Sequence, residues 1–158
     1  MTKPEFVYVT YISTTQEKVW QALTDTDIAR KYWIGGKGPA HMNVSDWRAG
    51  SRWEHQRADE SRAVDVVGKV VESAPPRRLV LTWARPAEFD DESKHSRVTF
   101  DIEPQDGGVV RLTVSHENLA HDPKMLASIS GGWPSVLSNL KTFLETGRAL
   151  DYTALQAR

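Results

Sequence analysis

The 158-residue chain is 39% hydrophobic and 26% charged, has a formal net charge of -1 at neutral pH and contains no cysteine. The missing cysteines exclude disulfides, thiolate metal sites and thiol nucleophiles, and the balanced charge argues against nucleic-acid binding. No apolar run approaches the roughly 20 residues that cross a bilayer, and the first residues lack a secretory signal, so we expect a cytoplasmic protein without membrane insertion. The length fits one domain over residues 1–158, with a core at about 6–147 and a tail at 148–158.

The first predicted element is a strand at residues 6–13, FVYVTYIS, which is rich in aromatic and β-branched residues. Thr14 and Glu17 have capping-box spacing, so they predict the start of a helix that ends near residue 25. A second short helix is expected at residues 26–33, before the glycines of IGGKG. Two small helices should therefore follow the first strand.

From residue 42 onward the hydrophobic period changes to two, which predicts six further strands. They are expected at residues 43–47, 51–57, 63–73, 77–84, 96–104 and 109–117. RAG, APPR and QDGG, which lie between paired strands, are sequences that break a strand or form a turn. The last two strands alternate apolar and polar residues, so one face of the sheet should be buried and the other solvated. The acidic segment 84–95 is expected to be a solvated, mobile loop.

The clearest helix pattern spans residues 134–146, where the apolar side chains fall within an arc of roughly 120°. Asp122 and Pro123 resemble the N-cap and first residue of a separate helical segment at 123–130, and Gly147 resembles a C-cap. The SGGWP sequence between the two segments combines two glycines with a proline, which cannot donate a backbone hydrogen bond. We therefore predict a hinge between two helical pieces, the second of which packs on the apolar face of the sheet.

No catalytic, metal or cofactor site is predicted from motifs. Neither GGKG at 35–38 nor SGG at 130–132 has the spacing of a phosphate-binding loop. The histidines at 41, 55, 95, 116 and 121 lack metal-ligand spacing. Ser115 and His116 are neighbours on a predicted strand, so they face opposite sides and cannot form a nucleophile and base pair. These observations favour a protein without cofactor or metal, and more a binding module than an enzyme.

Aromatic residues are the strongest candidates for a binding site, because apolar pockets favour aromatic walls with a few polar groups. His116 ends the inward row that begins at Val110, and His55 follows Trp53 by two residues, so each is either a structural histidine or a contact for a ligand. Trp20 is assigned instead to packing between helix and sheet. The predicted ligand-binding residues are Trp33, Trp47, Trp53, His55, Trp83, Phe100, His116, Trp133 and Leu137.

Several stretches together resemble a known superfamily. They are YISTTQEKVWQALTD at 11–25, YWIG at 32–35, DWRAGSRW at 46–53, GKVVESAPPRRLVLTW at 68–83, SRVTFDIEP at 96–104 and SGGWPSVLSNLKTFLETG at 130–147. In combination they resemble the START-like (SRPBCC) superfamily, and within it the bacterial relatives of the activator of the 90-kDa heat-shock chaperone ATPase. The resemblance implies an α+β helix-grip fold: a seven-stranded antiparallel curved sheet around a long C-terminal helix, with two short helices after the first strand.

The resemblance also implies a cavity between sheet and helix, which related proteins use for lipids, sterols, polyketides and other apolar molecules. Our leading hypothesis is binding of such a small hydrophobic molecule without covalent chemistry. One alternative is a cyclase, aromatase or hydrolase that uses His116, His55 or Asp65 for proton transfer. Another is a chaperone accessory or stress-response protein that binds its partner through the acidic residues 88–92 or an exposed sheet edge. A second copy of the chain, in a homodimer, is a further partner that we consider.

Overall fold

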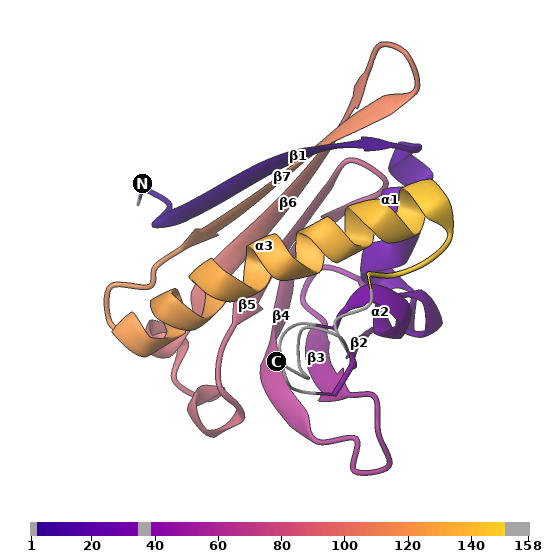
Figure 1. Cartoon of the computed structure of the whole chain (residues 1–158). Coiled ribbons are helices and arrows are strands. Elements are labelled where there is room, and N and C mark those ends of the chain that lie inside the picture. The colour runs from indigo at the N-terminus through magenta and orange to yellow at the C-terminus, as the bar shows by residue number, and fades with distance from the viewer. Residues whose placement is uncertain (1–2, 35–38, 151–158) are drawn as a thin grey trace.

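The computed structural model describes residues 3–34 and 39–150, so GGKG at 35–38 and the tail at 151–158 lie outside the described residues. Within the described part, seven strands form one antiparallel sheet in the order β1-β7-β6-β5-β4-β3-β2, and α3 lies across one face of it (Figure 1). The elements are β1 (Phe6–Ser13), α1 (Gln16–Thr24), α2 (Thr26–Tyr32), β2 (His41–Val44), β3 (Arg52–Arg57), β4 (Val64–Ala74), β5 (Arg78–Trp83), β6 (Ser96–Gln105), β7 (Val109–Glu117) and α3 (Pro123–Thr146). This arrangement confirms the predicted helix-grip fold.

The alternation of β6 and β7 places the core as predicted. Phe100 pairs with Val114, and both are buried, whereas Thr99 and Ser115 pair on the polar face and stay partly exposed. The buried row of β7 ends at His116, which is 0% exposed. Since side chains alternate along a strand, one face of the sheet is apolar and receives the helix.

The start of α1 differs by one residue from the expected capping box. Thr15, not Thr14, is the N-cap, and its side chain accepts a hydrogen bond from the Lys18 amide at 3.3 Å. Asp25 ends α1 and caps α2, where its carboxylate accepts from the amides of Asp27 and Ile28. Adjacent threonines offer the same hydroxyl, so only the chain direction after β1 selects between them.

α3 corrects the prediction of two helical pieces joined by a hinge. It is one helix from Pro123 to Thr146, with Gly131, Gly132 and Pro134 inside it, and it ends at Gly147 in the left-handed conformation with φ of 80°. An internal proline costs a helix about 3 kcal/mol and a glycine about 1 kcal/mol. The helix nevertheless continues because its buried residues lie on both sides of this segment; they are Ile129, Trp133, Val136, Leu137, Asn139 and Leu140.

The first hairpin also differs from expectation. β2 occupies residues 41–44 and not 43–47, and Trp47 lies in the following loop with a φ of 60°, partly buried against the core. In the acidic segment, two short 3₁₀ turns at Pro86–Glu88 and Glu92–Lys94 shape the loop. No helix in the described part of the chain has the length and apolar character needed to cross a membrane.

Candidate functional site

A cavity of about 150 Å³ lies between α3 and the sheet half formed by β3, β4 and β5. Its helix side is built from positions 129, 132, 133 and 136, whose spacing of three, four and seven places them on one face of α3. The lining residues are Trp33, His55, Val66, Trp83, Ile129, Gly132, Trp133 and Val136. The inward face of the sheet and the apolar stripe of the helix thus meet around one hollow.

Four of the eight lining residues carry aromatic rings. Trp133 lies at 5.7 Å from Trp33 and at 5.4 Å from Trp83, measured between ring centroids. His55 lies at 4.9 Å from Trp33 and at 6.0 Å from Trp83. These separations are within the range of favourable edge-to-face and tilted aromatic contacts, so the rings hold one another in place around the cavity.

His55 is the histidine of this wall, and its hydrogen bonds define its tautomer. The side-chain amide of Asn43 donates from Nδ2 to the Leu23 carbonyl at 3.2 Å, which leaves Asn43 Oδ1 as an acceptor 2.7 Å from His55 Nδ1. Nδ1 therefore carries the proton and donates, and Nε2 keeps a lone pair. Burial lowers the pKa of His55 to about 3, with a further lowering from the nearby His41, so the imidazole is neutral at pH 7.

A glycine on β4 supports the wall from behind. Gly68 pairs with Trp53 across the β3–β4 ladder, and the Trp53 indole donates from Nε1 to the Thr82 carbonyl on β5 at 2.8 Å. A Cβ at position 68 would lie 1.9 Å from that carbonyl oxygen and 2.7 Å from the indole nitrogen. Only glycine leaves room for an indole to cross the strand and pack 5.4 Å from Trp83.

His116 lies beside the cavity in a hydrogen-bonded relay that runs in one direction. Trp133 donates from Nε1 to His116 Nδ1 at 3.2 Å, so the proton of the neutral imidazole must be on Nε2. Nε2 then donates to Ser96 Oγ at 2.7 Å, and that hydroxyl donates to the Trp83 carbonyl at 3.1 Å. Burial lowers the pKa of His116 to about 4, and both ring nitrogens are occupied.

The relay bears on the enzymatic alternative. Ser96 and His116 are at the separation of a nucleophile and its general base, but a base must accept the hydroxyl proton, and here Nε2 donates it instead. Asp65 contacts Arg57 and His41, and hydrogen bonding from Arg57 is the main cause that holds its pKa below the usual range. In this arrangement neither His116 nor Asp65 is placed to accept a proton from a molecule in the cavity.

The structure brings the nine predicted ligand-binding residues together unequally. Trp33, His55, Trp83 and Trp133 line the cavity. Trp53, Phe100, His116 and Leu137 are buried in the surrounding core, and Trp47 packs only partly against it. Trp20, assigned to packing, is likewise partly buried against the core.

Sequence reasoning missed several residues that shape the site. Ile129 and Val136 belong to the same helical stripe as Trp133. Val136 was in the predicted apolar stripe but was not named as a ligand contact, and the assumed hinge separated Ile129 from that stripe. Val66 is the cross-strand partner of His55, which the alternation of β4 could have indicated. Asn43, which sets the tautomer of His55, and Ser96, which accepts from Nε2 of His116, carry no sequence signal because they lie 12 and 20 residues from these histidines along the chain.

The described residues form neither of the metal and phosphate sites that the sequence analysis considered. No group of three or more histidine, aspartate or glutamate side chains that could hold a metal ion occurs in residues 3–34 and 39–150. SGG at 130–132 lies within α3, where its amides belong to the helix. GGKG at 35–38 is outside the described part of the chain.

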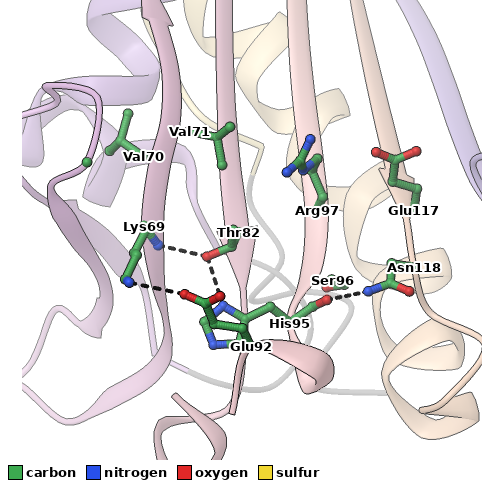
Figure 2. A pocket seen from close by; sticks show the side chains of 11 residues that line it. Lys69, Val70, Val71, Thr82, Glu92, His95, Ser96, Arg97, Glu117 and Asn118 are labelled. Atoms are coloured by element: carbon green, nitrogen blue, oxygen red, sulfur yellow. Dashed lines mark hydrogen bonds and ion pairs between the residues drawn. The ribbon is translucent and has the colours of Figure 1, made fainter. Parts of the chain in front are cut away.

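A larger hollow, of about 580 Å³, lies on the opposite, solvent-facing side of the sheet (Figure 2). Its polar groups bond to one another: Thr82 Oγ1 accepts from the Lys69 amide and contacts His95 Nδ1, and Lys69 Nζ pairs with Glu92 at 3.3 Å. Asn118 donates to the His95 carbonyl at 2.6 Å. Because these groups satisfy each other, we regard the smaller aromatic cavity as the candidate site.

Comparisons with known proteins agree with this fold. The family model described as "Activator of Hsp90 ATPase homolog 1-like protein" matches residues 13–145, whereas no curated protein matches the chain significantly. The solution structure of the Aha1 dimer from Colwellia psychrerythraea is 25% identical, with a TM-score of 0.65 over 91% of this chain and 98% of that one.

Two further solved structures share the fold. PFC0360w, an HSP90 activator from Plasmodium falciparum, is 18% identical with a TM-score of 0.68, over 90% of this chain and 96% of that one. CalU16 from Micromonospora echinospora is 20% identical with a TM-score of 0.65, over 89% and 76%. Since the family model spans most of the chain, this protein belongs to the family of Activator of Hsp90 ATPase homolog 1-like proteins.

Proposed function

We propose that this protein binds a small, mostly apolar molecule in the cavity beneath α3, without covalent chemistry. The observation that carries the proposal is a hollow of about 150 Å³ with aromatic walls between the buried face of the sheet and the helix. An engineered apolar protein cavity of that volume takes up benzene, whereas pockets for drug-sized ligands measure roughly 300–1,000 Å³. The cavity therefore suits a single ring, and a sterol, lipid or polyketide would require Trp33 or Trp133 to move.

The two glycines of α3 provide a direct test, because only Gly132 lines the cavity. A Cβ at either Gly131 or Gly132 meets no atom within 4 Å, so each position tolerates a larger side chain. We expect Gly132→Leu to fill or cover the cavity and Gly131→Leu to leave it unchanged. The two variants make the same substitution on neighbouring helix positions, so each controls for the other's effect on α3.

The measurement is thermal unfolding and ¹H–¹⁵N NMR titration with benzene and toluene. A ligand at ten times its Kd should stabilise the wild type and Gly131→Leu by about 1.4 kcal/mol. Gly132→Leu should lose most of this stabilisation and show no shifts at the cavity residues. If neither compound shifts the wild-type signals around Trp133, the cavity is only a packing defect and the proposal is wrong.

A second function, as a chaperone accessory, is favoured by the edge strand β1. Val7, Val9 and Tyr11 are 53%, 47% and 50% exposed, which gives this strand an apolar outer face. β1 is the last strand of the sheet, and its far end is covered, where Lys141 donates to the Tyr11 carbonyl and Glu145 accepts from the Ser13 amide. Exposed apolar edge strands are typical sites for pairing with another chain.

Titration against the host's 90-kDa heat-shock chaperone tests this second function. Val9→Lys should weaken binding and any change in the chaperone's ATPase rate by tenfold or more. Val71→Lys is the matched control, since Val71 is an exposed valine, at 38%, on β4. Light scattering of the free protein shows whether a second copy occupies the β1 edge instead. An unchanged response of Val9→Lys to the chaperone would rule out this edge as the contact.

A further inference from the structure

We infer that the ligand of the α3 cavity is a single-ring aromatic alcohol of the phenol class, whose hydroxyl donates a hydrogen bond to His55 Nε2. The inference rests on the proposed binding function and adds the chemical class of the ligand. It follows from the direction of the hydrogen bonds that reach His55 and from the size and lining of the cavity.

The hydrogen bonds fix which atom of His55 is open. Asn43 is buried, at 4% exposure, and its Nδ2 donates to the Leu23 carbonyl. The opposite orientation of this amide would place two oxygens face to face. Asn43 Oδ1 is therefore held against His55 Nδ1, which donates to it, and Nε2 makes no hydrogen bond with any residue that the structure describes. An acceptor on a wall of the cavity is left for a ligand.

The open atom selects a donor. His55 remains neutral because burial lowers its pKa to about 3, so Nε2 presents a lone pair throughout the physiological range. A ligand carbonyl or carboxylate would place its own lone pairs against it, and an ammonium group would lose its hydration in a wall made otherwise of apolar side chains. A neutral hydroxyl can donate without either penalty. A site with a buried hydrogen-bonding group discriminates strongly against analogues that lack its partner.

The volume and lining of the cavity restrict the rest of the ligand. The volume of about 150 Å³ accommodates one ring, and the indoles of Trp33, Trp83 and Trp133 offer it faces and edges. The indole Nε1 of Trp83 is buried and has no partner among the described residues, and the ring lies 6.0 Å from that of His55. Because protein atoms cover this N–H, the ligand hydroxyl needs only the His55 acceptor.

The test compares phenol, anisole and toluene by calorimetry or NMR titration. Anisole keeps the ring and the oxygen of phenol but cannot donate a hydrogen bond. A net hydrogen bond corresponds to a factor of roughly 2 to 12 in affinity, so phenol should bind about fivefold tighter than anisole. His55→Phe should abolish this preference while anisole and toluene change less than twofold. His121→Phe, at an exposed histidine, should keep it.

The outcomes separate the two proposals. If phenol and anisole bind equally well, the hydroxyl inference is overturned and cavity binding stands. If none of the three compounds binds, the proposed function itself fails. Should His55→Phe not fold, the wild-type ratio still decides, together with the ¹⁵N resonances of the histidines. Phenol should shift Nε2 of His55 and anisole should not, and a shift confined to His116 would contradict the assignment.

Discussion

His55 and His116 lie on the same buried face of the sheet, on β3 and β7, and both contact Trp83, yet their environments differ. His116 has both nitrogens occupied, by Trp133 and Ser96, and carries its proton on Nε2. His55 has one nitrogen occupied, by Asn43, and carries its proton on Nδ1. Burial and a lowered pKa are common to both, so neither property identifies a binding group. The difference is that His55, a residue of the cavity wall, keeps an acceptor without a partner among the described residues, whereas His116 does not.

Acid should lower the free energy of unfolding through both His55 and His116, and this is the largest effect that we expect. Because the pKa falls from 6.5 to about 3 in His55 and about 4 in His116, the unfolded state binds more protons below pH 6.5. Stability is fully present above that pH and is lost as the pH falls. Between pH 7 and pH 5 we expect a loss of about 4 kcal/mol, at roughly 1.4 kcal/mol per unit and site. Urea unfolding measures it.

A variant assigns the acid effect to its source. His116→Gln cannot be protonated in this range and should show about half of the pH dependence of the wild type. His121→Gln, at an exposed histidine, should retain all of it. A wild-type stability that stays flat between pH 7 and pH 5 would mean that neither imidazole is held neutral by burial.

Gly68→Ala should disturb the packing around both histidines. The Trp53 indole that crosses Gly68 contacts the rings of Trp83 and His55, and Trp83 in turn contacts His116. The added Cβ would collide with the Thr82 backbone carbonyl at 1.9 Å, which no side-chain rotation relieves. We expect a loss of about 3 kcal/mol in the free energy of unfolding. A loss below 1 kcal/mol would show that the strand separates easily here and that Trp53 does not need the glycine.

Ser96→Ala should affect the surroundings of His116 and leave those of His55 unchanged. It removes the acceptor of the buried Nε2–H and should cost about 2 kcal/mol. Ser128→Ala, at an exposed position of α3, should be close to neutral. Long-range ¹H–¹⁵N spectra should then report a shifted Nε2–H signal for His116, whose tautomer the Trp133 donor still fixes, and an unchanged Nδ1–H signal for His55. Identical histidine spectra in the wild type and Ser96→Ala would disprove the relay.

Gly131→Ala should leave the surroundings of both histidines unchanged, and we expect it to change the free energy of unfolding least. The glycine lies inside α3, has no positive φ, and offers open space to a methyl group. Since alanine loses less conformational entropy than glycine in a helix, we expect a gain of about 0.5 to 1 kcal/mol. A destabilised variant would indicate that α3 flexes at this point, as the predicted hinge between two helical pieces would require. Chemical denaturation distinguishes the two outcomes.

Much of the fold could be predicted from the sequence because its signals are local. The two-residue period of 96–104 and 109–117 fixed which side chains of β6 and β7 face the core, and Asp122 and Gly147 marked the ends of α3. The same local reasoning failed at SGGWP. It counted the cost of glycine and proline but not the opposing burial of Ile129 and Trp133, which each gain on the order of 2 kcal/mol from the core.

The sequence by itself determined a helix-grip sheet with an apolar inner face and marked tryptophans and histidines as candidates for its lining. Only the tertiary structure decided that four of the nine candidates meet around one small cavity, that Gly68 makes room for Trp53, and that His55 and His116 hold opposite tautomers. The reason is physical: a hydrogen bond's direction depends on partners such as Leu23 and Asn43, which are distant in sequence and become neighbours only when the chain is folded.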